Sequence, residues 1–181
     1  RSAGMNAVLG NEEFRAALFR LGDLVVAEAP DPLAILGIRR RGVPLAARIR
    51  EHLENAGRRD IPVGELDINL YRDDVHDRGI PRIGETRIPF ALEERHILLV
   101  DDVLFTGRTV WAALTALSNF GRPRSVRLAV MVDRGGRELP IAPDFVGLRL
   151  EAGDGDMVRV RIREEDGEDG VVTISRGDAA A

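Results

Sequence analysis

The spacing of apolar residues along the chain predicts a series of buried strands. Three short runs are almost entirely apolar, which is typical of parallel strands covered on both faces: residues 33–38 (LAILGI), 96–100 (HILLV) and 126–133 (VRLAVMVD). Residues 63–74 instead alternate, with Leu66, Ile68 and Leu70 separated by polar residues. This alternation predicts a strand with one buried face.

Between these strands, apolar residues recur every three or four positions, which predicts helices. The first predicted helix is residues 11–29, with Asn11 as the N-cap and Phe14, Leu18, Leu21 and Val25 inward. The second is residues 43–57, with Pro44 in the first turn and Gly57 at the end. The third is residues 109–121, with Val110, Leu114 and Leu117 inward. Strands that alternate with helices indicate an α/β fold with an open, mostly parallel twisted sheet flanked by helices.

The C-terminal part of the chain follows a different pattern. Residues 145–150, 157–162 and 171–175 predict short, partly antiparallel strands, which would form a small hood beside the main sheet. Residues 73–89 are polar, contain Gly and Pro, and show no periodicity, so we expect a flexible lid loop there. We expect one domain over residues 1–181, with the four residues ahead of Met5 outside the fold.

Composition narrows the classes of protein. Hydrophobic residues make up 44% of the 181 residues, and no apolar run approaches the roughly 20 residues of a membrane span. The absence of cysteine excludes disulfides and thiolate chemistry, and we expect a cytoplasmic protein. All 26 basic residues are arginine, whose planar guanidinium suits phosphate, but the net charge is −4. Any nucleic-acid surface must therefore be a local patch.

Two polar turns follow predicted strands. Ligands in such sheets bind beyond the carboxyl ends of the strands, so residues 39–44 (RRRGVP) and 101–109 (DDVLFTGRT) should share one rim. Residues 106–109 lead into a helix start, where free N–H groups and hydroxyls suit a phosphate. Asp101 and Asp102 could accept hydrogen bonds from vicinal hydroxyls or attract chelated magnesium. This pairing suggests a ribose 5-phosphate; the alternative is an acidic turn with a helix-capping threonine.

These residues carry a family resemblance. The segment ILLVDDVLFTGRT (97–109) resembles the phosphoribosyl pyrophosphate (PRPP) signature of type I phosphoribosyltransferases. Together with GIRRRG, VGELDINLYRDD and GRPRSVRLAVMVDRGGRELPI, it is similar to the pyrimidine operon attenuation regulators, the PyrR family. The resemblance covers about residues 7–176. It implies uracil phosphoribosyltransferase activity combined with binding of leader messenger RNA.

The resemblance also implies a PRPP site. Its residues would be Arg40, Arg41, Val100, Asp101, Asp102, Val103, Leu104, Phe105, Thr106, Gly107, Arg108 and Thr109. The two aspartates would hold the ribose 2- and 3-hydroxyls and indirectly a Mg²⁺ ion, while residues 106–109 would hold the 5-phosphate. Arg40 and Arg41 would bind the diphosphate with Mg²⁺, although an arginine-rich turn is also often a solvated loop. No organic cofactor is implied.

A base pocket would lie on residues 131–140, with Arg134, Arg137 and the backbone near Val158 close to uracil; the alternative is a strand ending in a polar turn. Arg72 would help to orient the diphosphate end of the site, with residues 73–89 closing over it as a lid. The chain departs from the family at three positions: Arg40 replaces Thr, Phe105 replaces Tyr, and Gly136 replaces His. Other branches place an acid at the position of Phe105, so no general base is assigned, and the uracil proton would pass to water or diphosphate.

The resemblance further implies a leader RNA stem-loop, UMP or UTP, and a second copy of the chain as partners. Arg15 and Arg20 match basic positions of the family, and Arg48, Arg50, Arg58 and Arg59 could extend a basic surface. The alternative function is an RNA-binding regulator that uses the site only as a nucleotide sensor. For His52, His76 and His96 we expect solvated or structural roles, and for residues 164–170 (EEDGEDG) a solvated turn rather than a metal loop.

Overall fold

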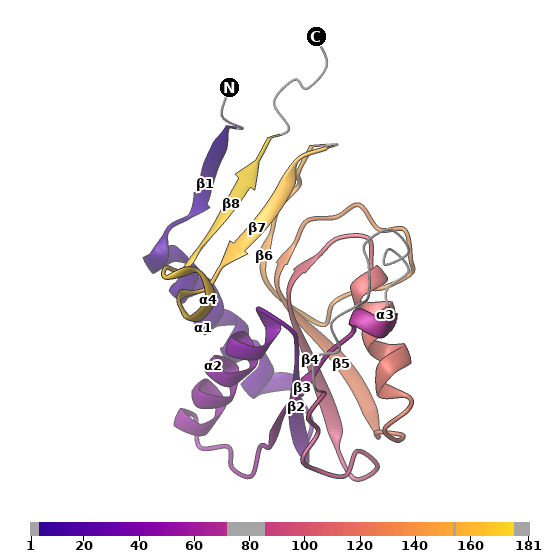
Figure 1. The fold of residues 1–181 in the computed structure, drawn as a ribbon. Coiled ribbons are helices and arrows are strands. Elements are labelled where there is room, and N and C mark those ends of the chain that lie inside the picture. Colours follow the sequence, from indigo (N-terminus) through magenta and orange to yellow (C-terminus); the bar gives the residue numbers. More distant parts are fainter. Residues whose placement is uncertain (1–3, 72–85, 154, 176–181) are drawn as a thin grey trace.

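The computed structural model describes residues 4–71, 86–153 and 155–175, which form two sheets (Figure 1). The main sheet has five parallel strands in the order β3-β2-β4-β5-β6. Its strands are β2 (Leu33–Ile38), β3 (Val63–Leu66), β4 (His96–Leu104), β5 (Ser125–Asp133) and β6 (Phe145–Arg149). The predicted α/β class with an open parallel sheet is therefore confirmed.

The second sheet is the predicted hood. It consists of β1 (Met5–Leu9), β8 (Gly170–Ile174) and β7 (Met157–Arg161), paired antiparallel in that order. A short helix, α4 (Arg163–Asp166), connects β7 to β8. In Figure 1 the hood stands over α1 and α2, beside the main sheet. Of the predicted lid, residues 73–85 lie outside the described residues, as does Arg72.

Helices cover both faces of the main sheet. The helices are α1 (Asn11–Glu28), α2 (Gly42–Asn55) and α3 (Arg108–Leu117), with a 3₁₀ turn η1 (Asn69–Tyr71). Side chains of β2 alternate between two cores: Leu33 and Ile35 pack with α1 and α2, whereas Ala34 and Leu36 pack with α3. All six residues of β2 are buried, because each face of a parallel sheet is covered. No helix in the described part is long and apolar enough to span a membrane.

Several boundaries differ from the sequence predictions. Asn11 is not the N-cap of α1: Gly10 is, and its N–H donates to Glu13 Oε2 at 2.8 Å. The strand predicted over residues 63–74 ends at Leu66, and the chain then turns through η1 while Ile68 remains buried. The first segment of the predicted C-terminal group, β6, joins the main sheet in parallel with β5, and β1 was not predicted.

The most consequential difference lies in β4. The strand was predicted to end at Val100, with a turn starting at Asp101, but it continues to Leu104. Asp101 pairs with Val130 of β5, and Val103 with Val132, so the register with β5 carries the strand past both aspartates. The acid pair is thus fixed on the sheet rather than placed on a loop.

Candidate active site

The turns after β2 and β4 meet at one cavity of about 730 Å³, as predicted. Its lining includes residues of the loop after β2, the end of β3, the end of β4, the start of α3 and the hood: Arg39, Arg40, Arg41, Glu65, Asp67, Asp101, Asp102, Val103, Thr109 and Glu165. Glycine at position 42 permits this close approach, because a Cβ there would clash with the carbonyl oxygen of Val100 in β4. The start of α2 therefore sits directly against the strand that carries the acids.

Backbone hydrogen bonds hold the acid pair. Asp101 is 6% exposed, and its Oδ1 accepts a hydrogen bond of 2.9 Å from the backbone N–H of Asp102. Asp102 Oδ1 accepts an equally long bond from the N–H of Val103. Asp102 is half-buried, and both residues line the cavity. The sheet therefore presents two ordered carboxylates to any ligand bound at this rim.

The turn before α3 has the shape of an anion cradle. Gly107 is the N-cap residue with φ of +91°, and the Arg108 N–H donates to Thr106 Oγ1 at 3.3 Å. A left-handed backbone of this kind favours glycine. Thr109 reaches the cavity wall, whereas the Arg108 side chain extends to Glu138 with an Nε–Oε2 distance of 2.8 Å. The cradle therefore offers backbone N–H groups and hydroxyls, but Arg108 is turned away.

The arginine loop is bound to acidic residues of other elements. A cis peptide joins Arg39 to Arg40. Three ion pairs follow in order: Arg39 with Glu65 at 3.0 Å, Arg40 with Glu165 at 3.0 Å, and Arg41 with Asp166 at 2.7 Å. Two of the three acids belong to α4 of the hood, which reaches over the start of α2.

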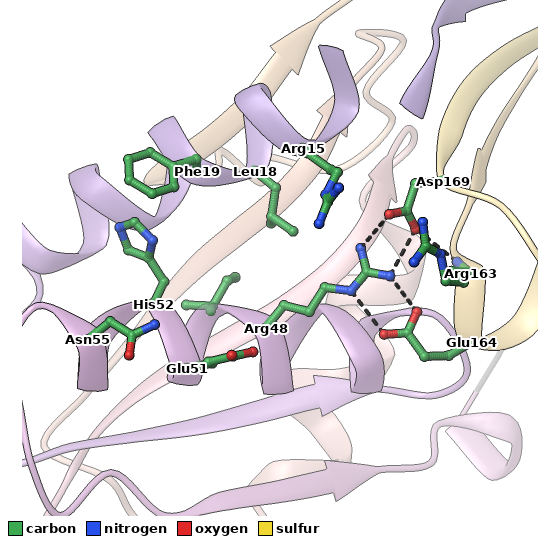
Figure 2. A pocket seen from close by; sticks show the side chains of 11 residues that line it. Arg15, Leu18, Phe19, Arg48, Glu51, His52, Asn55, Arg163, Glu164 and Asp169 are labelled. Atoms are coloured by element: carbon green, nitrogen blue, oxygen red, sulfur yellow. Dashed lines mark hydrogen bonds and ion pairs between the residues drawn. The ribbon is translucent and has the colours of Figure 1, made fainter. Parts of the chain in front are cut away.

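The interpretation of residues 164–170 as a solvated turn is therefore only partly right. Glu164 and Glu165 are exposed, but Asp169 is 6% exposed and accepts two hydrogen bonds from Arg48. Figure 2 shows the Arg48 guanidinium between Glu164 and Asp169. The segment connects the hood to α2 and to the loop before it through ion pairs with arginines.

The Arg41 ion pair changes the ionisation of both partners. The hydrogen bonds from Arg41 lower the pKa of the Asp166 carboxyl to about 2. In turn, the hydrogen bond to Asp166 raises the pKa of Arg41, with smaller electrostatic contributions from Asp166, Asp102 and Glu165. Arg41 and Asp102 line the same cavity, and their opposite charges interact there.

On the proposed base side, a ring and a guanidinium are stacked. The guanidinium carbon of Arg134 lies 3.9 Å from the centroid of the Phe105 ring, and its Nη1 donates to the Asp156 carbonyl at 2.7 Å. Val158, two residues further along β7, turns its side chain into the core. Gly136 has φ of +73°, and a Cβ there would lie 2.5 Å from Cε2 of Phe105.

Arg137 shapes the neighbouring loop. It donates to Asp133 Oδ1 at 2.7 Å, to the Phe105 carbonyl at 2.8 Å and to the Ile141 carbonyl at 2.9 Å. With these three bonds Arg137 ties the loop after β5 to the end of β4. Within the described residues, Arg137 thus holds the loop that was predicted to contact the base.

The RNA candidates lie elsewhere. Arg15 lines a second cavity of about 460 Å³ between α1, α2 and α4, while Arg20 is exposed outside it (Figure 2). Arg58 bonds to Asp31 and the Val25 carbonyl, and Arg48 is bound as described, so both have structural partners.

Two of the histidines have the structural roles expected from the sequence. His52 contacts Asp23 at 2.8 Å, and His96 contacts Ser125 at 2.7 Å. His76 lies outside the described residues.

Comparison with known proteins agrees with this geometry. Residues 20–165 match the family described as "Phosphoribosyl transferase domain". A mutant hypoxanthine phosphoribosyltransferase from Trypanosoma cruzi, in a ternary complex with substrates, has a TM-score of 0.70 at 18% identity and covers 99% of this chain and 98% of its own. The enzyme from Staphylococcus aureus gives 0.66 at 17% identity, covering 97% and 94%. Fold and domain match define the class as a phosphoribosyltransferase.

Sequence relatives narrow this class. The "Bifunctional protein PyrR" of Thermus aquaticus is 50% identical over 162 residues, covering 88% of this chain and 90% of the relative. The protein of the same description from Deinococcus radiodurans is 46% identical over 165 residues, covering 90% of each. The chain therefore belongs to the PyrR family, which confirms the resemblance drawn from its motifs.

Proposed function

We propose that the protein is a uracil phosphoribosyltransferase, forming UMP and diphosphate from uracil and PRPP, and that it regulates pyrimidine operons by UMP-dependent binding of leader RNA. The observation that carries the enzymatic part is the shared cavity. It joins an ordered acid pair, the start of α3 through Thr109, and an arginine loop within one space of about 730 Å³. These are the three chemical groups that a sugar carrying a phosphate and a diphosphate requires.

In this proposal each group binds one part of PRPP. Asp101 and Asp102 accept hydrogen bonds from the ribose 2- and 3-hydroxyls, since ionised carboxylates are acceptors only. The Thr106–Thr109 turn binds the 5-phosphate through backbone N–H groups. Arg40 and Arg41 bind the diphosphate, because guanidinium donors match phosphate oxygens. The backbone of Val100 and Leu104 in β4, and of Phe105 directly after it, positions these groups.

Magnesium fits this cavity as part of the substrate. Within the described residues, no group of three or more His, Cys, Asp or Glu side chains could hold a metal ion. The paired carboxylates of Asp101 and Asp102 are oxygen ligands of the kind Mg²⁺ prefers, and a diphosphate supplies further oxygens. We therefore infer that Mg²⁺ arrives chelated by PRPP, where it neutralises charge on the leaving diphosphate.

The reaction exchanges one bond at C1 of the ribose. The bond from C1 to the diphosphate oxygen breaks, and a uracil nitrogen forms the new bond to C1. Arg40 and Arg41 stabilise the negative charge on the departing diphosphate, and the aspartates hold the ring while positive charge develops on it. Phe105 cannot accept a proton, so the uracil proton passes to water or to diphosphate. Arg134, stacked on Phe105, is proposed to contact uracil, with Arg137 and the Val158 backbone shaping that wall.

The regulatory part rests on family membership, with Arg15 and Arg20 as RNA-binding candidates. A second candidate function is a regulator that uses the cavity only to sense UMP or UTP. In both cases the protein acts in the cytoplasm as a homo-oligomer. RNA binding should weaken steeply with salt, because neutralised phosphates release counterions.

Two measurements test the proposal. Incubation with uracil, PRPP and Mg²⁺ should yield UMP; no UMP formation under these conditions contradicts the enzymatic part. Filter binding of a pyrimidine-operon leader stem-loop, with and without UMP, should give tighter binding with UMP. RNA affinity that is the same with and without UMP, or no binding at moderate salt, contradicts the regulatory part. RNA binding by a protein that forms no UMP favours the sensor.

A further inference from the structure

Three consecutive acids of the hood each bind a different arginine in or just before α2. Glu164 binds Arg48, Glu165 binds Arg40, and Asp166 binds Arg41. Arg40 and Arg41 lie in the loop after β2, and Arg48 lies on the second turn of α2. The three pairs differ in the number of hydrogen bonds, in burial and in access to the cavity, and these differences single out Asp166.

Only the Asp166–Arg41 pair combines fixed geometry with access to the cavity. Arg41 Nε donates to Asp166 Oδ2 at 3.0 Å, and Nη2 donates to Oδ1 at 2.7 Å. Both side chains are largely buried, at 23% and 13% exposure. Arg40, by contrast, makes one hydrogen bond to Glu165, and its side chain is 78% exposed. A single exposed ion pair orders a side chain poorly.

Arg41 keeps donors for a ligand while it is held. A guanidinium has five N–H donors, and the two bonds to Asp166 use two of them. Within the described residues, the remaining three donors of Arg41 have no hydrogen-bond partner. Arg41 lines the cavity, so these donors are available to an anion there without breaking the pair. Asp166 thus need not compete with the diphosphate.

The carboxylate that holds Arg41 is itself fixed. Asp166 Oδ2 accepts a hydrogen bond of 2.9 Å from the backbone N–H of Ile162, at the start of α4. Ile162 is fully buried in the core, so the backbone group that holds Asp166 is itself held in place by packing. A series of contacts therefore connects the backbone of the hood, through Asp166, to Arg41 at the cavity.

We propose that Asp166 is a positioning residue for phosphoribosyl transfer: it holds the Arg41 guanidinium where its free N–H donors bind the diphosphate of PRPP. This inference rests on the function proposed above and deepens it, since it assigns the hood a part in binding the leaving group. Preorganising a charged donor saves the cost of ordering a long side chain on binding.

The test measures binding of inorganic diphosphate with Mg²⁺ by calorimetry, together with steady-state rates. Asp166→Asn keeps an oxygen for the Ile162 N–H but removes the charge that fixes Arg41. We expect about a tenfold rise in the diphosphate Kd and in the KM for PRPP, the size of one lost charge-assisted interaction. The KM for uracil should change less than twofold. Asp166→Glu, which keeps the charge, should recover part of the affinity.

Glu164→Gln is the matched control. Glu164 lies on the same helix and also binds an arginine through two bonds, to Arg48 at 2.9 and 2.5 Å, but Arg48 faces the second cavity (Figure 2). This variant removes the charge from a two-bond ion pair between the hood and α2 without touching Arg41. Its diphosphate Kd should stay within twofold of the wild type.

A double-mutant cycle separates positioning from a structural effect. In an Arg41→Ala background, Asp166→Asn should change the diphosphate Kd less than twofold, since the group it positions is gone. An equal effect in both backgrounds, or a wild-type Kd for Asp166→Asn alone, overturns the inference. Failure of the wild type to form UMP would instead contradict the proposed function, and the diphosphate measurements would still decide the role of Asp166.

Discussion

Replacing Asp102 by Asn tests the acid pair most directly. The carboxylate of Asp102 lines the cavity and accepts a hydrogen bond from the Val103 N–H through Oδ1. An asparagine oxygen can accept the same bond at the same place, so the strand end should keep its structure. What the substitution removes is the negative charge and the second acceptor that the ribose hydroxyls would use.

The expected magnitude follows from the type of bond lost. A hydrogen bond to a charged group contributes about 1.5–3 kcal/mol, which corresponds to a loss of roughly tenfold to 150-fold. The amide NH₂ also places a donor where the ligand offers hydroxyl donors. We therefore expect kcat/KM for PRPP to fall by at least roughly tenfold at saturating uracil. The assay is UMP formation measured over a PRPP titration.

Asp144→Asn is the control for this experiment. Asp144 Oδ2 also accepts a backbone hydrogen bond, from the Leu128 N–H at 2.8 Å, but Asp144 lies outside the cavity. This variant should keep the wild-type rate and a similar thermal unfolding midpoint. A wild-type kcat/KM for Asp102→Asn, with unfolding unchanged, would remove the ribose-binding role assigned to the acid pair.

Three more outcomes are expected. Arg41→Ala should raise the KM for PRPP about tenfold or more and the KM for uracil much less, because only PRPP carries the diphosphate; equal effects in a two-substrate titration would argue against that role. Gly42→Ala should destabilise the protein by about 1–3 kcal/mol in urea unfolding, because its Cβ would clash with the backbone of β4, whereas Gly4→Ala, with nothing within 4 Å, should have no effect. The pKa of Asp166 is depressed from 3.8 to about 2, so its ion pair stabilises the fold above pH 4 and loses this effect as the pH falls through about 2. The free energy of unfolding, measured with urea, should therefore be about 2 kcal/mol higher for the wild type than for Asp166→Asn at pH 7. This difference should disappear in acid, and a difference that persists at pH 2 would contradict the assigned ion pair.

Local patterns predicted those elements whose residues carry their own signal. The run 33–38 reads as a buried strand because every residue in it is apolar, and it is one. The Thr-Gly-Arg-Thr turn before a helix start likewise identified the cradle, since the glycine and the helix periodicity are adjacent in sequence. The rim shared by residues 39–44 and 101–109 followed from the rule for parallel sheets.

Contacts between distant segments could not be predicted in this way. Asp166 and Arg41 are 125 positions apart, and nothing in the EEDGEDG segment distinguishes acids that bind arginines from acids that bind water. The alternating pattern predicted a strand over residues 63–74, but the strand ends at Leu66. The pattern could not show this end, because pairing with the neighbouring strand decides where an edge strand stops. The strand β1 has five residues and becomes a strand through its pairing with β8, which the local sequence does not encode.

The contact between Gly136 and Phe105 constrains how this wall could be redesigned. A side chain at position 136 would overlap the phenyl ring and would also have to adopt a left-handed backbone. The Arg134 guanidinium is stacked on the same ring, with its carbon 3.9 Å from the ring centroid. Under the base-binding role proposed for this wall, a larger residue at position 136 would therefore call for a smaller one at position 105.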